Sequence, residues 1–71
     1  MNPWIKALQD NYAAEISKAI ATLNVYLNTS VGIGDHSDIF TEIQKQIDLL
    51  DSADSKLATL NKYINSKILI R

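Results

Sequence analysis

The chain contains no cysteine, one proline, two glycines and one histidine among its 71 residues. Without cysteine it forms neither disulfides nor thiolate metal sites. No apolar run approaches the roughly 20 residues that a membrane-spanning helix needs, and the amino terminus lacks the basic start and apolar core of a signal peptide. We therefore expect a protein that does not enter a membrane and that stays in the cytoplasm.

The charges of the two signs nearly cancel, since the net charge is -1, and hydrophobic residues make up 46% of the chain. This composition is typical of a globular protein and provides no general attraction to nucleic acid or anionic lipid. Residues 35–54 carry six acidic residues and one lysine, whereas every charged residue from position 55 onward is basic. The second half of the chain is therefore polarised from acidic to basic.

A first helix is predicted over about residues 3–28. Asn2 followed by Pro3 is typical of a helix start, with an N-capping side chain and a proline at the first helical position. Apolar residues then recur at three- and four-residue steps as far as Leu27, and Asn28 breaks the pattern. At about 1.5 Å per residue this helix would be close to 40 Å long.

Both glycines, Gly32 and Gly34, lie in the segment 29–36 that follows. Because glycine adopts positive φ without strain, the chain can reverse direction there within a few residues. A helix–helix connector is the favoured interpretation of this loop. A phosphate-binding glycine loop has less support, because no strand precedes it and no Gly-Lys-Ser/Thr sequence follows.

A second helix is predicted over about residues 37–66, with polar residues around Asp35 and His36 at its start. Its apolar residues follow a seven-residue repeat, and Ala53 keeps that repeat in phase through the polar stretch 51–55, so one continuous helix is expected. The predicted core or oligomer seam consists of Ile39, Ile43, Ile47, Leu50, Leu57, Leu60 and Ile64.

The predicted architecture is an all-α antiparallel helical hairpin that forms a single domain over residues 1–71. A single core is usually marginal at this size, and the apolar stripes are broader than two helices can cover. We therefore predict a homo-oligomer, most simply a four-helix bundle or another helical oligomer, together with an unidentified protein partner. The acidic half of one copy could lie against the basic half of another.

The residues Asp35, His36, Asp38 and Glu42 form the one cluster with metal-ligand side chains. Acidic residues near a helix start are expected on helix-dipole grounds alone, and the Glu-x-x-His signature of di-iron bundles is absent. We expect no cofactor, although metal binding by this cluster is left open. We also expect no enzymatic activity, since the serines near His36 lack a suitably spaced base and orienting acid.

Lys56, Tyr63 and Lys67 share one face of the second predicted helix and offer two cations and a stacking ring. The acidic residues upstream and the negative net charge favour a solvated face over a nucleic-acid site. Two functions thus remain from the residues themselves. The first is a protein–protein interaction module, and the alternative is a small regulator or nucleic-acid-processing accessory that uses this basic arm.

The run from Val31 to Ile39, Val-Gly-Ile-Gly-Asp-His-Ser-Asp-Ile, resembles a segment of small helical-hairpin proteins of tailed bacteriophages, particularly T-even-like marine phages. The Ala-Asp-Ser-Lys-Leu sequence from Ala53 to Leu57 is similar as well. The resemblance covers about half of the chain and implies a phage accessory protein of the host cytoplasm or the virion. It implies no activity, and Ser37 stands where some of those proteins have proline, which leaves the helix start less sharply fixed.

Overall fold

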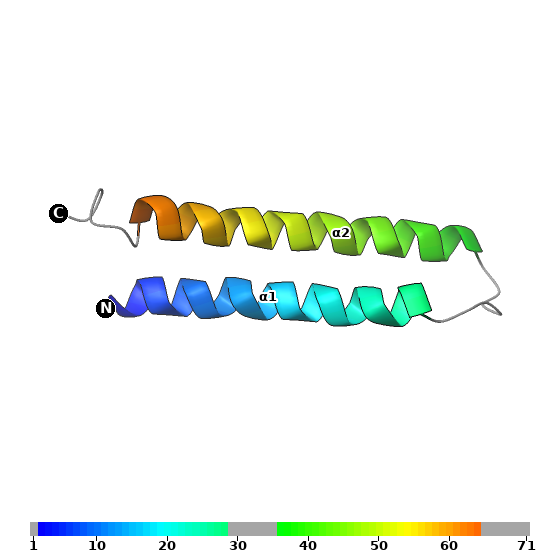
Figure 1. The fold of residues 1–71 in the computed structure, drawn as a ribbon, viewed down its shortest axis with the longest axis horizontal. Helices are drawn as coiled ribbons and strands as arrows, with labels where there is room; N and C mark the ends of the chain where they lie inside the picture. Colours follow the sequence, from blue (N-terminus) through cyan, green and yellow to red (C-terminus); the bar gives the residue numbers. More distant parts are fainter. Residues whose placement is uncertain (1, 29–35, 65–71) are drawn as a thin grey trace.

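The structure, a computed structural model, describes residues 2–28 and 36–64. These residues form two antiparallel α-helices, α1 (Pro3–Asn28) and α2 (His36–Thr59), and a π-helical turn, η1 (Leu60–Ile64), that continues α2 (Figure 1). No strand occurs in these two ranges. The prediction of an all-α helical hairpin is confirmed, and the molecule is a rod of 55 × 15 × 14 Å.

The start of α1 is fixed by the two residues that the sequence indicates. The side-chain Oδ1 of Asn2 accepts a hydrogen bond from the backbone N–H of Trp4 at 2.7 Å. The carbonyl of Asn2 accepts the first helical hydrogen bond, from the N–H of Lys6 at 3.1 Å. Asn2 is therefore the N-cap, and Pro3 occupies the first helical position, where its missing N–H leaves no bond unmade.

α1 ends at Asn28, where the apolar periodicity also stops. The side-chain amide of Asn28 donates to the backbone carbonyl of Asn24 at 2.8 Å. This is a local side chain–backbone contact over one helical turn at the end of the helix.

α2 begins at His36 and continues through the polar stretch 51–55 without a break, as predicted. Its last turn widens into the π-helix η1, which the sequence pattern does not predict. The end of the predicted helix at residues 65 and 66 lies outside the described residues, as does the connector with Gly32 and Gly34. None of the described helices is both long and apolar enough to cross a lipid bilayer.

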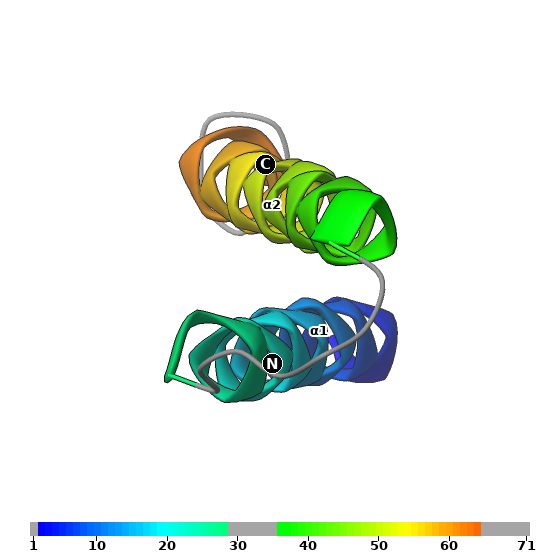
Figure 2. The ribbon, with the colours of Figure 1, turned by 90° about the vertical axis from the view of Figure 1, so that its right-hand side faces the viewer.

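Figure 2 shows the two helices lying side by side, so that each presents one narrow strip to the other. The side chains buried along this strip, within the described residues, are Ile5, Ala19, Leu23, Ala53 and Leu60. Ile5 and Ala19 are fourteen residues apart and Ala53 and Leu60 are seven apart, which is the repeat of helices packed in coiled-coil fashion. We call this strip the contact line.

The seven residues of the predicted seam are buried to different extents in the structure. Leu60 is buried, and four of them are half-buried: Ile39, Ile43, Leu50 and Leu57. Ile47 and Ile64 are 51% and 37% exposed. Ile47 is not part of the core of the hairpin, because Ala53 and Leu60 occupy the contact line and Ile47 projects to one side of it.

Candidate functional site: two grooves of opposite charge

A shallow groove runs along each side of the contact line, and each groove takes residues from both helices. We call the first the acidic groove. Its residues are Ile16, Ile20, Ile47, Leu50, Asp51 and Asp54. Four branched aliphatic side chains and two carboxylates line it, and no lysine or arginine does.

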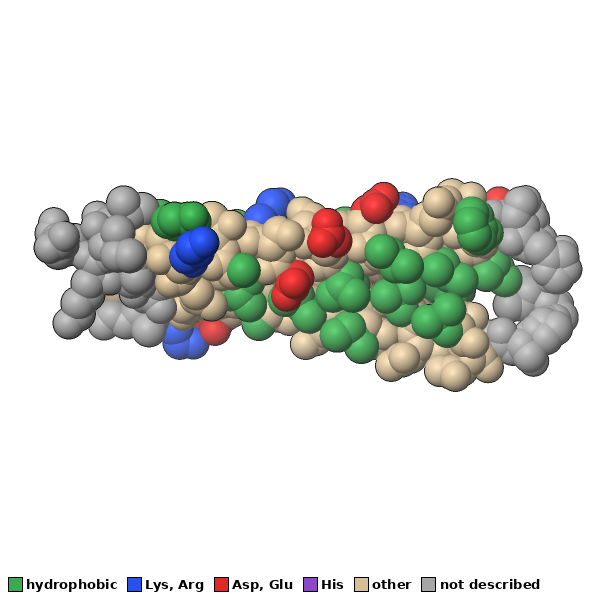
Figure 3. Space-filling view, turned by 45° about the horizontal axis from the view of Figure 1, so that its top comes forward, with side chains coloured by type: hydrophobic (Ala, Val, Ile, Leu, Met, Phe, Trp, Pro, Cys, Tyr) green, Lys and Arg blue, Asp and Glu red, His purple; other side chains and the backbone are tan. Residues whose placement is uncertain are grey.

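Two aliphatic side chains of the acidic groove are open to solvent, with Ile20 46% exposed and Ile47 51% exposed, and the other two, Ile16 and Leu50, are half-buried. Leu27 lies two helical turns beyond Ile20 and Phe40 two turns before Ile47, so both continue the same faces toward the connector, and each is 64% exposed. Figure 3 shows a face on which hydrophobic side chains gather over the connector-proximal half of the rod, with acidic side chains beside them.

Helical spacing explains why two carboxylates border this groove. Asp51 and Asp54 lie three residues apart, and each follows an apolar residue of the groove by a helical turn or less. Within residues 2–28 and 36–64 neither carboxylate forms an ion pair, and both side chains are exposed. Their charges are therefore available to a binding partner.

The groove on the other side of the contact line has the opposite charge, and we call it the basic groove. Ala19 of the contact line and the half-buried Gln46 line its floor. The other residues that line it are Glu15, Lys18, Lys45, Leu49, Ser52 and Lys56. Leu49 is 51% exposed and is the large apolar side chain of this groove.

The formal charges of the two grooves are equal and opposite. Three lysines and one glutamate give the basic groove +2, and two aspartates give the acidic groove -2. Along α2, Lys45 and Lys56 bracket Asp51 and Asp54, so both charge clusters occupy the same stretch of the rod. The hairpin is thus electrically polarised from one side to the other, across its width.

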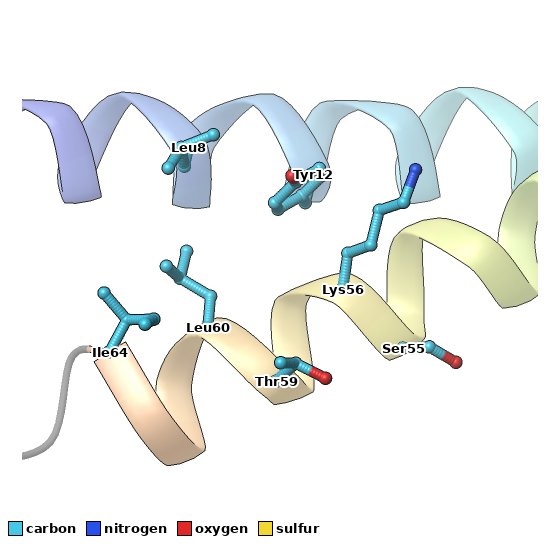
Figure 4. A pocket seen from close by; sticks show the side chains of 7 residues that line it. All are labelled: Leu8, Tyr12, Ser55, Lys56, Thr59, Leu60 and Ile64. Atoms are coloured by element: carbon cyan, nitrogen blue, oxygen red, sulfur yellow. The ribbon is translucent and has the colours of Figure 1, made fainter. Parts of the chain in front are cut away.

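A third hollow lies nearer the free ends of the helices (Figure 4). Leu8 and Tyr12 of α1 point toward Leu60 and Ile64, and the side chain of Lys56 extends toward α1 beside them. Because Lys56 also lines the basic groove, this hollow extends that groove along the rod. The basic side therefore carries its own exposed apolar strip.

The structure keeps two residues of the predicted nucleic-acid face together. Lys56 and Tyr63 are two helical turns apart and both are exposed. The Tyr63 ring already has a cation against it, since Lys62 Nζ lies 5.1 Å from its centroid. Lys67, the third residue of that face, lies outside the described residues.

The glycine connector and the predicted cluster of metal-ligand side chains lie largely outside the described part of the chain. Gly32, Gly34 and Asp35 lie outside it, and so does the side chain of His36. Among the described residues no group of three or more His, Asp or Glu side chains could hold a metal ion.

The sequence interpretation missed the pairing of Asp51 and Asp54 with Ile47 on one side, and of Lys18 and Lys45 on the other. The signal was present in the helical spacing. Along α2 the acidic residues follow Ile47 by four and seven positions, whereas Lys56 follows Leu49 by seven. The sequence alone displays polarity along α2, and polarity across the hairpin emerges only when the two helices are oriented against each other.

Comparison of the chain with protein-family models, with curated proteins and with solved structures finds no match. The two charged grooves are therefore the features from which a function can be inferred.

Proposed function

We propose that this hairpin is a non-enzymatic helical interaction module that associates with further copies of itself and acts through protein–protein contacts. The observation that carries the proposal is the amount of large apolar surface left open by the two helices. The side chains concerned, each at least 37% exposed, are Trp4, Leu8, Ile20, Val25, Leu27, Phe40, Ile47, Leu49, Tyr63 and Ile64. Apolar surface that is contiguous, as it is along the grooves, marks interaction sites.

The small core supports the same proposal. Two of the five buried side chains in the described part are alanines, Ala19 and Ala53, and no large side chain there is fully buried. Two helices alone therefore remove little apolar surface from water, and chains of this size commonly gain stability by oligomerisation. A second hairpin laid over Ile20 and Ile47 would bury them and give a four-helix bundle or another helical oligomer.

The setting we propose for this module follows from the resemblance to small tailed-phage proteins, namely an accessory role in the host cytoplasm or the virion. The alternative function, a small regulator or nucleic-acid-processing accessory that uses the basic arm with Lys56 and Tyr63, gains support from Lys18 and Lys45, which line one groove with Lys56. Glu15 in the same groove and the net charge of -1 weigh against it, because nucleic-acid binders are usually basic over their footprint.

Self-association is tested by measuring molar mass with multi-angle light scattering over a concentration series. We expect the wild type to exceed the mass of one chain. The double variant Ile20→Ser/Ile47→Ser should be lighter at the same concentration, because about half of each side chain is exposed in the isolated hairpin and is available for intermolecular contacts. Its helicity by circular dichroism at low concentration should match that of the wild type.

A matched control is the pair Ala21→Ser/Ala58→Ser, which makes two exposed positions outside both grooves more polar. This control should keep the wild-type mass. A wild-type mass of one chain throughout the series would rule out the proposed function.

A further inference from the structure

We propose that the copies lie side by side and associate head to tail, in the sense that each contact joins two different surfaces. The basic groove of one hairpin covers the acidic groove of the next. This inference rests on the proposed self-association and specifies its geometry. Every hairpin would then bind one neighbour through its acidic groove and a second neighbour through its basic groove.

Charge complementarity is the first argument. The acidic groove carries -2 and the basic groove +2. If two acidic grooves faced each other across a two-fold axis through their centre, Asp51 and Asp54 of both copies would meet beside apolar surface, where like charges repel most. Head-to-tail contact instead places those carboxylates against lysines of the neighbour.

The second argument is that the centres of the two charge clusters lie at nearly the same position along the axis of the rod. The midpoint of Lys45 and Lys56 and the midpoint of Asp51 and Asp54 differ by two residues, or about 3 Å along the helix axis. A neighbour laid alongside in the same direction therefore places its Lys56 within about 3 Å of the level of Asp54 along the axis, and its Lys45 about 9 Å from the level of Asp51.

The apolar parts of the two grooves also complement each other. Leu49 projects from the basic groove with 51% of its surface exposed, and the acidic groove is floored by aliphatic side chains that include the exposed Ile20 and Ile47. A leucine flanked by lysines, inserted between isoleucines flanked by aspartates, gives an apolar centre with a charged rim. This is the usual anatomy of a protein interface.

An interface between two different surfaces leaves one groove free at each end of any assembly. Such heterologous contacts continue until they close into a ring, or they extend into a filament. The wild-type mass is therefore expected to rise with concentration beyond two chains. It is also expected to fall as salt is added, because exposed charges are screened.

The test uses two charge-reversal variants. Asp51→Lys/Asp54→Lys changes the acidic groove from -2 to +2, so both grooves are basic. Lys45→Glu/Lys56→Glu changes the basic groove from +2 to -2, so both grooves are acidic. Because all four side chains are exposed, the fold should be retained in both variants, and circular dichroism checks this.

Head-to-tail contact predicts that each variant alone stays at the mass of one chain at low ionic strength and that an equimolar mixture associates again. Light scattering or sedimentation velocity gives the masses. The matched control compares two single variants, Asp48→Lys and Asp54→Lys. Both make the same charge change on the same helix. Asp48 lines neither groove, so its variant should associate as the wild type does.

Two results would overturn the head-to-tail geometry while leaving self-association intact. One is a wild-type assembly that stops at two chains and survives in both reversal variants, and the other is a mixture that fails to recover association. A wild type that remains a single chain would overturn the geometry and the proposed function together.

Discussion

The side-chain amide of Gln9 donates a hydrogen bond to Oδ1 of Asn61 at 2.9 Å, which ties the first third of α1 to the π-helical turn η1. The two residues are 52 positions apart in the sequence and lie at the edge of the contact line. A polar pair beside an otherwise apolar seam selects one register between two helices, because a shift of either helix leaves its polar groups without each other.

A double-mutant cycle with Gln9→Ala and Asn61→Ala measures this contact. Because the pair is exposed to water, we expect a coupling free energy of about 0.5 kcal/mol, at the low end for a protein hydrogen bond. Urea unfolding followed by circular dichroism gives the four stabilities. Strictly additive single-variant effects would show that the two side chains do not interact in solution.

The helices themselves could be predicted from local chemistry. Asn2 and Pro3 fix the start of α1, the loss of apolar periodicity at Asn28 fixes its end, and Ala53 carries the repeat of α2 through a polar stretch. Each of these signals acts within one or two helical turns of chain. No knowledge of the other helix is needed to interpret them.

What could not be predicted depends on how α1 and α2 are turned toward each other. Leu50 and Ile47 are both large aliphatic residues, yet Leu50 is half-buried beside the contact line whereas Ile47 is 51% exposed. The π-helical turn at Leu60–Ile64 has no local sequence signal and coincides with the contact between Gln9 and Asn61. The division into an acidic and a basic side follows from the same relative rotation.

The N-cap of α1 gives a prediction that depends on a single atom, Oδ1 of Asn2. Replacing Asn2 by Ala removes the acceptor of the Trp4 N–H and should lower the free energy of unfolding by about 1 kcal/mol, whereas Asn2→Ser should change it little. Thermal unfolding followed by circular dichroism compares the stabilities of these two variants with that of the wild type. As a control, Asn11→Ala loses only an exposed 3.4 Å contact to Glu15 and should be nearly neutral.

Substituting one buried and one exposed leucine tests which residues form the core. Leu60 is 6% exposed and Leu27 is 64% exposed. Leu60→Ala should therefore cost about 2 kcal/mol or more through lost burial and the cavity left behind. Leu27→Ala should cost less than about 0.5 kcal/mol when unfolding is measured at concentrations too low for association. Equal losses in the two variants would contradict the assigned contact line.

The basic side should bind nucleic acid weakly. With Glu15 among three lysines, few phosphates can be neutralised, so fluorescence anisotropy of labelled single-stranded DNA should show no binding at about 0.15 M salt. Binding that persists at that salt concentration and disappears in Lys56→Ala/Tyr63→Ala would instead favour the nucleic-acid alternative. Asp48→Ala serves as the control for nonspecific effects of substitution on α2.

The small residue Ala53 sets how closely the helices approach. It is 1% exposed on the contact line, so a larger side chain there has no free volume to enter. Ala53→Leu should lower the free energy of unfolding by about 1–3 kcal/mol through overpacking. Ala58→Leu makes the same exchange at an exposed position of the same helix and should stay within about 0.5 kcal/mol of the wild type. A stabilised Ala53→Leu variant would mean that α1 and α2 do not meet along Ala53.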